Sequence, residues 1–387
     1  MLDENLTDLA AAASRYATAS KLDKGKILDE LCRATGWHRS HARRRLVRMG
    51  THGVPSSARP RRPVYDSDTV DALYFCWVVL GRPTGKRLVA VLPELVPALR
   101  RHGELTVSDA VASALTAMSP ATIDRRLAPH RGSTAPGLDA LGVPGAGRAR
   151  VPIVPSTWWG HGPLGRVELD VVVHHGWRPE DPPCSTITIV DGATGWTERR
   201  SVANMNRATA ALTTLAHGFP FTITGVHSVA VGDGLNEELA AWCSDRRIEF
   251  VRSCLGTGND GTPGERRSRA QIHAITGYHW HGPDSVFPLN RMWERHDPLS
   301  NFFCPQQRVI RGARSGDRVR RRYDTATTPY RRVLRHDRVS LEDKNILADR
   351  YETLNPARLH REIRELKADL NLRPRARLAC AHASRAS

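Results

Sequence analysis

The sequence predicts an α/β protein, in which a mixed five-stranded sheet with helices on its faces follows helical DNA-binding blocks and precedes a basic C-terminal region. Three observations lead to this prediction: the order of strand-like and helix-like segments after Arg166, two helix-turn-helix patterns before it, and the distribution of charge. With 387 residues, the chain is long enough for two or three domains with cores of their own.

The segments after Arg166 alternate between strand and helix patterns. Apolar Val167 and Leu169 alternate with Glu168 and Asp170, which is the period of a strand. Strands are expected at 167–175, at two places within 185–202, at 221–231 and at 248–253, and helices at 203–219, 236–247 and 263–279. Three strands, then helix, strand, helix, strand and helix describe a mixed sheet flanked by helices.

The N-terminal half carries two candidate helix-turn-helix units. Residues 24–50 predict a helix, a turn at Gly36 and a second helix. This second helix carries five arginines, at Arg39, Arg43, Arg44, Arg45 and Arg48. An ordinary surface hairpin is the alternative, but five arginines on one short helix favour DNA. A second helical block runs from about 69 to 127, and Ser119-Pro120 begins its last helix, which carries Arg125 and Arg126.

Positive charge lies mainly outside the predicted sheet. The net charge is +17 and the pI is about 10.3. Residues 166–285 hold 11 basic and 14 acidic residues, whereas the rest of the chain holds 46 basic and 26 acidic residues. A GC-rich genome that favours arginine would also raise the basicity, but basic arms around a near-neutral middle are typical of proteins that bind DNA phosphates.

The pattern of cysteines and the lengths of the apolar runs indicate the cellular compartment. The seven cysteines are scattered and none forms a CxxC pair, which is typical of a reducing cytosol. The sequence has no signal-peptide pattern and no apolar run of 18 residues. We therefore expect a cytoplasmic bacterial protein, associated with the nucleoid when bound to DNA, that has no membrane partner.

A basic segment follows the predicted sheet. Residues 308–335 contain ten arginines and two aspartates, and small residues and β-formers separate the arginines. The pattern predicts a small β-rich or extended DNA-binding unit, with a disordered basic linker as the alternative. Residues 341–370 then predict two helices, separated at Asn355-Pro356.

Several of these segments resemble DDE-type insertion-sequence transposases with an integrase-like, ribonuclease-H-like catalytic core. KGKILDELCRATGWHRSHA is similar to the family's N-terminal DNA-binding helices, VELDVVVHH to its first catalytic strand, and DGATGWTERRSV to the hairpin after that strand. LSNFFCPQQ and RRYDTATTPYRRVL resemble the segments that follow the core, and the second of these is fairly family-specific. The similarity covers most of the chain.

Composition and resemblance together predict six parts of the chain. These are an N-terminal helix-turn-helix at 1–55, a second helical DNA-binding block at 66–129, a linker at 130–160, an integrase-like catalytic core at 161–295, a basic DNA-binding segment at 296–336 and C-terminal helices at 337–375. The candidate DNA contacts are Arg39, Arg43, Arg44, Arg48, Arg125, Arg126, Arg320, Arg321, Arg322, Arg331 and Arg332.

The resemblance also implies an activity: DNA integration, transposition and recombination of a mobile element by cleavage and strand transfer. In this chemistry two Mg²⁺ or Mn²⁺ ions stabilise the attacking and leaving oxygens, and carboxylates hold the metals. The implied partners are double-stranded DNA and further copies of the chain, which would form a homo-oligomer on paired DNA ends.

Two of the three acids that the resemblance implies are present. Asp170 corresponds to the first acid and Glu265 to the third, and both would be metal ligands. The family leaves 35 residues between its last two acids, and counting back from Glu265 leads to Val229. Valine can neither coordinate a metal nor offset its charge, so we expect this protein to be impaired as an enzyme.

Nearby residues leave alternatives open. Asp233 could substitute for the missing acid if its helix begins early, and His227 and Asp260 also lie close in sequence. Imidazole is a poor Mg²⁺ ligand, however. The alternative function is a non-catalytic helix-turn-helix DNA-binding protein or regulator, and the residue at position 229 distinguishes the two: Asp favours catalysis and Val disfavours it.

Overall fold

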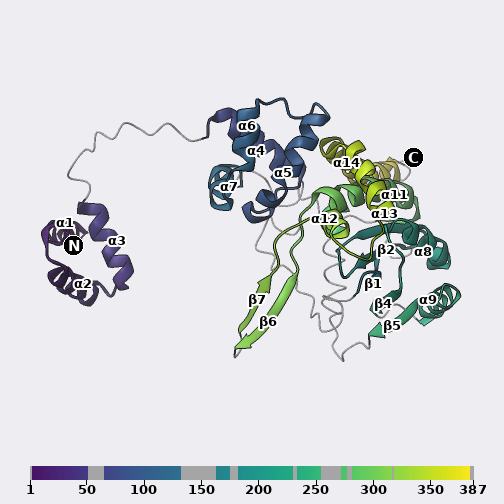
Figure 1. The fold of residues 1–387 in the computed structure, drawn as a ribbon, viewed down its shortest axis with the longest axis horizontal. Helices are drawn as coiled ribbons and strands as arrows, with labels where there is room; N and C mark the ends of the chain where they lie inside the picture. Colours follow the sequence, from purple (N-terminus) through teal and green to yellow (C-terminus); the bar gives the residue numbers. More distant parts are fainter. Residues whose placement is uncertain are drawn as a thin grey trace. The chain divides into compact units, whose positions relative to one another are not determined.

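The structure is a computed structural model that describes residues 2–50, 65–131, 163–174, 182–229, 233–253, 272–276, 281–315 and 318–383 (Figure 1). The chain divides into two compact units, Met1–Val64 and Tyr65–Ser387. Residues 132–162, which include most of the expected linker, lie outside the described residues.

The first unit contains the helices α1 (Leu2–Thr18), α2 (Lys21–Thr35) and α3 (Arg39–Gly50). They pack around a small core that includes Tyr16, Leu28 and Leu46. Ser20 caps α2 by accepting a hydrogen bond from the backbone N–H of Asp23. Gly36 ends α2 with φ of 69°, a left-handed conformation that favours glycine. The sequence therefore forms the expected helix, turn and helix at 24–50.

The second unit begins with four helices: α4 (Ser67–Val79), α5 (Gly85–Arg101), α6 (Asp109–Thr116) and α7 (Pro120–Leu127). Asp66, Ser108 and Ser119 cap α4, α6 and α7 through their side chains. The carboxylate of Asp124 accepts a hydrogen bond of 2.8 Å from the backbone N–H of Gly85, so it caps α5 from α7. A short 3-10 helix, η2 (Ala128–Arg131), follows.

The central sheet has five strands in the order β3-β2-β1-β4-β5. Their bounds are Arg166–His174 (β1), Cys184–Asp191 (β2), Thr197–Val202 (β3), Gly225–Val229 (β4) and Glu249–Ser253 (β5). β1, β2 and β3 pair antiparallel, whereas β4 and β5 run parallel to β1. The predicted fold class, an α/β protein with a mixed five-stranded sheet and flanking helices, is confirmed at this level.

Two helices cover the apolar face of the sheet. A short 3-10 helix, η3 (Met205–Arg207), leads into α8 (Ala208–His217), and α9 (Asp233–Asp245) lies between β4 and β5 in the sequence. Leu212 of α8 and Trp242 of α9 belong to the same core as Val167 and Leu169 of β1. Burying these large side chains on one face is the main source of the sheet's stability.

The C-terminal part packs against both the sheet and the helical block. It contains a helical turn at 272–276, η4 (Pro283–Ser285), α11 (Val286–Pro298), the π-helical η5 (Leu299–Phe303), the hairpin strands β6 (Val309–Ser315) and β7 (Arg318–Tyr323), α12 (Pro329–Leu334), α13 (Leu341–Thr353) and α14 (Pro356–Ala383). The guanidinium of Arg361 in α14 donates two hydrogen bonds, of 2.7 and 2.8 Å, to the carboxylate of Glu104. The hydroxyl of Tyr351 donates to the backbone oxygen of Glu94 in α5. These hydrogen bonds attach the C-terminal helices to the helical block α4–α7.

Candidate functional site

The second face of the sheet carries several polar side chains although it is buried. Asp170 and His174 of β1 lie on it, as do Thr186 and Thr188 of β2, and all four side chains are no more than 6% exposed. His174 Nε2 lies 2.7 Å from Thr186 Oγ1, which lies 2.8 Å from Ser201 Oγ on β3. Trp293 Nε1 of α11 donates to the same Ser201 oxygen at 2.9 Å. The polar side chains are therefore part of a hydrogen-bonded interior.

Asp170 stands in the middle of β1, as the sequence predicts. Its Oδ1 accepts a hydrogen bond of 2.9 Å from the backbone N–H of Val171. Thr188 lies directly opposite on β2, on the same face of the sheet. The Thr188 hydroxyl is buried and makes no hydrogen bond among the described residues. A buried polar group without a partner is costly, and such groups are concentrated at functional sites.

Position 229 lies next to Asp170 in the sheet. β1 and β4 pair in parallel, with Glu168 opposite His227 and Leu169 opposite Ser228. One residue further along each strand come Asp170 and Val229, the last residue of β4. Residues in register on neighbouring parallel strands share a face. Position 229 is therefore the position on β4 from which a carboxylate could reach the same point as Asp170.

Of the other candidate ligands, His227 is the one whose side chain the structure describes. Glu265 and Asp260 lie outside the described residues. Asp233 begins α9, and only its backbone is described. His227 is partly buried beside Glu168, and burial lowers its pKa, which keeps the imidazole neutral near pH 7. Within the described ranges, no three carboxylate, imidazole or thiol groups gather around a common point.

Side chains from α11 and η5 complete the open edge of the sheet. β3 is an edge strand, and its outward backbone groups would otherwise be unpaired. Asn290 and Asn301 each exchange two hydrogen bonds with one residue of β3, Ser201 and Thr197 respectively, at 2.7–2.9 Å. Asp297 accepts from the backbone N–H of Arg199 at 2.8 Å. The 290, 297, 301 spacing places these polar residues on one helical face, which is the only trace of this arrangement in the sequence.

Charge is buried where β3 meets α11. The Arg199 guanidinium forms an ion pair with the Asp297 carboxylate, and both side chains are at most 6% exposed. Burial, followed by the nearby Asp297 carboxylate, raises the pKa of Glu198 to about 8, although Trp196 donates a hydrogen bond to it. Burial lowers the pKa of His296. Glu198 and Arg199 lie on β3, and His296 and Asp297 lie on α11, so these groups serve the packing of α11 on β3.

The arginines of α3 separate into two groups. Arg39 forms an ion pair with Asp29 and donates to the backbone oxygen of Gly25 at 3.3 Å. Arg45 lies over the ring of Trp37, with 5.9 Å between the guanidinium carbon and the ring centre. Arg43 and Arg44 are both exposed, so they can meet a DNA backbone. The side chain of Arg48 lies outside the described residues.

The remaining candidate arginines also differ in their surroundings. Arg125 is exposed on α7 and Arg126 is partly exposed. Arg331 forms an ion pair of 2.6 Å with Glu94, and Arg332 forms one of 3.0 Å with Asp324 while only 10% exposed. Arg331 and Arg332 therefore bind other parts of the chain. Only the backbone is described for Arg320, Arg321 and Arg322, all in β7.

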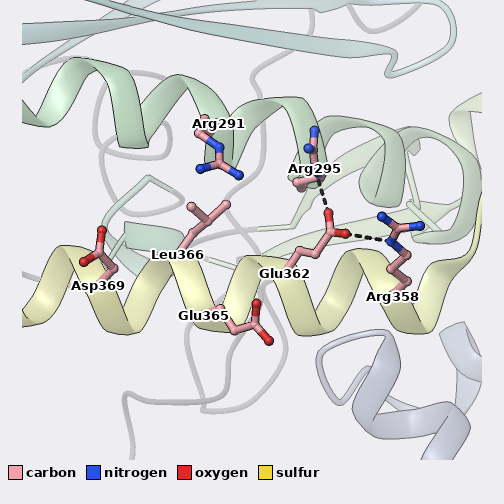
Figure 2. A pocket seen from close by; sticks show the side chains of 7 residues that line it. All are labelled: Arg291, Arg295, Arg358, Glu362, Glu365, Leu366 and Asp369. Carbon is pink, nitrogen blue, oxygen red and sulfur yellow. Dashed lines mark hydrogen bonds and ion pairs between the residues drawn. The ribbon is translucent and has the colours of Figure 1, made fainter.

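A groove of about 500 Å³ lies between α11 and α14 (Figure 2). Its lining consists of Arg291, Arg295, Arg358, Glu362, Glu365, Leu366 and Asp369. The carboxylate of Glu362 accepts hydrogen bonds from Arg295 at 2.6 Å and from Arg358 at 2.7 Å. Because cationic and anionic side chains are equal in number, the groove favours neither anions nor cations. The ion pair between Arg295 and Glu362 joins α11 to α14, whereas Arg358 and Glu362 both lie on α14.

Comparison with known proteins identifies one family. No protein-family model matches the chain. The chain is 32% identical over 326 residues to "Uncharacterized protein y4rM" of Sinorhizobium fredii (strain NBRC 101917 / NGR234), and the match covers 83% of this chain and 93% of that protein. The chain therefore belongs to the same family as y4rM.

Among solved structures, the chain is similar in part to a chain in a cryo-EM structure of a simian T-cell lymphotropic virus intasome in complex with the PP2A regulatory subunit B56 gamma. The TM-score is 0.21 at 10% identity, and the match covers 32% of this chain and 56% of that chain. A likeness of this size carries no argument about fold or function. Separately, within the described residues, every helix is too short or too polar to cross a bilayer.

Proposed function

We propose that the protein is a transposase- or integrase-like DNA-binding protein of the DDE type, with a ribonuclease-H-like core, in which catalysis is impaired because Val229 occupies the position of the second acid. It would act on double-stranded DNA in the integration, recombination or regulation of a mobile element. We further propose that it works as a homo-oligomer on paired DNA ends.

The observation that carries this proposal is the register between β1 and β4. Leu169 pairs with Ser228, so Asp170 and Val229 follow side by side on one face of the sheet. The 35 residues between position 229 and Glu265 are a feature of the sequence, whereas the register between β1 and β4 is a feature of the backbone. Both lead to position 229, and this agreement supports its assignment as the second acid position.

The connectivity supports a ribonuclease-H-like core. A three-stranded antiparallel meander is followed by α8, the parallel strand β4, α9 and the parallel strand β5. This order gives the sheet β3-β2-β1-β4-β5, in which the first strand is central. A central β1 beside β4 is what a site built from both strand positions requires.

Valine at position 229 would remove both a ligand and a negative charge from the site. Mg²⁺ prefers carboxylate oxygen, and its octahedral geometry tolerates little displacement of a ligand. Chemistry that depends on positioning loses rate steeply when a group moves by about 1 Å. The valine in the sequence at this position therefore supports DNA binding, and not catalysis, as the proposed function.

The second candidate function is a DNA-binding regulator without catalysis. The same observation, Val229 beside Asp170, favours it, together with the exposed arginines of α3. Such a protein would occupy DNA ends, or join assemblies of active relatives, without cutting.

An assay of cleavage and strand transfer tests the proposal. Duplex oligonucleotides from the ends of the encoding DNA segment would be incubated with a target plasmid and Mg²⁺ or Mn²⁺. We expect the unmodified chain to bind the duplex but to produce no transfer product, and Val229→Asp to gain activity that Asp170→Asn removes again. Activity of the unmodified chain that Asp170→Asn abolishes would contradict the impairment, and absence of duplex binding would contradict the proposal as a whole.

A further inference from the structure

The strands β6 and β7 form a two-stranded sheet of their own, which Figure 1 shows as a long hairpin. They pair antiparallel from Arg311↔Arg322 to Ser315↔Arg318, after an irregularity between Val309 and Arg311. Side-chain positions alternate along a strand, and opposite residues share a face. One face of the ribbon therefore carries Arg311, Arg318, Arg320 and Arg322 together with Ala313 and Ser315.

The other face carries Gly312, Arg314, Val319 and Arg321, so the ribbon beyond the Val309↔Tyr323 pair at its base has no continuous apolar face to bury. An isolated two-stranded hairpin is marginally stable in water, and like charges directly opposite each other destabilise it further. Arg311 and Arg322 form such a pair. A hairpin of this composition gains most from a polyanion that neutralises its arginines.

The base of the ribbon is fixed to the sheet by described side chains. The Asp324 carboxylate accepts hydrogen bonds from the Arg308 backbone N–H at 2.5 Å and from Arg332 at 3.0 Å. Arg332 also donates to the backbone oxygens of Gln306 at 2.9 Å and of Thr194, in the turn between β2 and β3, at 3.2 Å. Because Arg332 is nearly buried, this network fixes the two strands where they leave the body of the protein.

We propose that the hairpin β6–β7 is an arm that enters a groove of duplex DNA, with its four-arginine face toward the phosphates and base edges. This inference rests on the proposed DNA-binding function and names the element that provides much of the contact. The major groove of B-DNA is about 12 Å wide and admits a two-stranded β-ribbon. The major groove of A-form RNA is too deep and narrow for this, so duplex DNA is the partner that the ribbon fits.

A triple substitution of the full-length protein tests the arm. Arg318, Arg320 and Arg322 are replaced by glutamine, and binding to a 30-base-pair DNA duplex is measured by fluorescence anisotropy at several salt concentrations. Each lost phosphate contact lowers the slope of log K against log salt by about 0.9, so we expect a slope smaller by about 2 to 3 and affinity at least about tenfold weaker at low salt.

The matched control replaces three exposed cations elsewhere, Arg291, Arg338 and Arg364, by glutamine. It removes the same charge, and we expect its slope to change by less than about 1. Equal effects of the two triple variants would show that general charge, and not the ribbon, binds the DNA. A duplex RNA of the same length should bind more weakly and lose little in the arm variant; an equal loss would overturn the groove assignment.

A substitution at Asp324, where the ribbon leaves the body of the protein, distinguishes an anchored arm from a loosely attached basic tail. The Oδ1 of Asp324 accepts from the Arg308 backbone N–H and its Oδ2 from Arg332. Asp324→Asn makes the protein more positive, but it replaces one of these two acceptors by an amide nitrogen and removes the charge that faces Arg332. An anchored arm predicts weaker DNA binding, by about threefold or more, in spite of the added charge. Unchanged or tighter binding, with the same thermal unfolding as the parent, would overturn the anchoring. If the unmodified chain itself does not bind the duplex, the proposed function fails, whereas binding unaffected by the arm variant refutes the arm alone.

Discussion

At the scale of single residues, buried charge gathers where β3 meets α11, and Glu198 is its most perturbed carboxyl. Burial and the Asp297 carboxylate raise the pKa of Glu198 from an ordinary value of 4.5 to about 8. The folded chain therefore holds a proton that the unfolded chain releases at a lower pH. The stability that this group contributes is full below about pH 4.5 and is lost as the pH rises through about 8.

We therefore predict that Glu198→Gln flattens the decrease of the melting temperature between pH 5 and pH 9 and makes the protein more stable than its parent at pH 9. Thermal unfolding followed by circular dichroism at several pH values measures this. Glu238→Gln, at an exposed position of α9, is the matched control and should leave the profile unchanged. A Glu198→Gln profile parallel to that of the parent would show that Glu198 is ionised in the folded protein.

The arginines of α3 differ at the same scale. Arg43 faces outward, whereas Arg39 binds Asp29 and Gly25 of α2. We predict that Arg43→Ala weakens duplex DNA binding by about three- to tenfold and lowers the salt slope by about 1, as expected for a lost phosphate contact. Arg39→Ala should leave the salt slope within about 0.3 of the parent value, because its guanidinium is held by an internal partner. Anisotropy titrations on the full chain measure both, and identical slope changes would contradict this division.

At the scale of elements, α11 and η5 replace a missing neighbour strand at the edge of the sheet. Asn290 satisfies both the N–H and the C=O of Ser201. Removing one partner leaves a buried backbone group unsatisfied, at a cost of about 1–3 kcal/mol. We predict that Asn290→Ala lowers the free energy of unfolding by this amount, measured by urea denaturation.

Two further variants give this measurement its controls. Asn290→Asp keeps the acceptor for the Ser201 N–H but places a charged oxygen against the Ser201 C=O, so its loss should be at least as large as that of Asn290→Ala. Asn345→Ala, on the exposed surface of α13, should change the free energy of unfolding by less than about 0.5 kcal/mol. If all three variants unfold at the same urea concentration, the edge is held by other contacts.

Local sequence patterns predict some features of these elements and not others. The five strands and most helices follow from periodicity and turn residues, and the position of Asp170 in the first strand followed with them. The burial of Thr186, Thr188 and Arg199 did not, because alternation alone assigns polar residues to solvent. The helix that covers them, α11, lies about 90 to 100 residues later in the chain. Such a partner becomes visible only when the sheet is assembled.

At the scale of the whole molecule, hydrogen bonds and ion pairs join the helical block to the C-terminal helices. The two hydrogen bonds from Arg361, followed by that of Asn355, hold the pKa of Glu104 well below its ordinary value of 4.5, at about 2. A lowered pKa stabilises the folded state above about pH 4.5, and this contribution is lost as the pH falls toward about 2. The junction should therefore loosen in acid.

We predict that Glu104→Gln lowers the protection of backbone amides in α5 and α14 against hydrogen exchange by about three- to tenfold at pH 7. Relative to the intrinsic exchange rate at each pH, it should also reduce the further loss of protection between pH 5 and pH 3. Hydrogen-exchange mass spectrometry of the full chain measures the exchange of backbone amides in both helices. Asp349→Asn, an exposed acid on α13, is the control and should leave exchange unchanged. Protection equal to that of the parent in both helices would show that the apolar core alone joins these parts.

The central claim is that position 229 stands beside Asp170 and that valine there deprives the protein of a metal site. Titration with Mn²⁺, with the free ion followed by electron paramagnetic resonance, tests it in the unmodified chain, in Val229→Asp and in Val229→Asp with Asp170→Asn. We expect Val229→Asp to bind Mn²⁺ and the added Asp170→Asn to abolish this binding. In the unmodified chain we expect no Mn²⁺ binding that depends on Asp170. Mn²⁺ binding by the unmodified chain that equals that of Val229→Asp, and that Asp170→Asn removes, would contradict it.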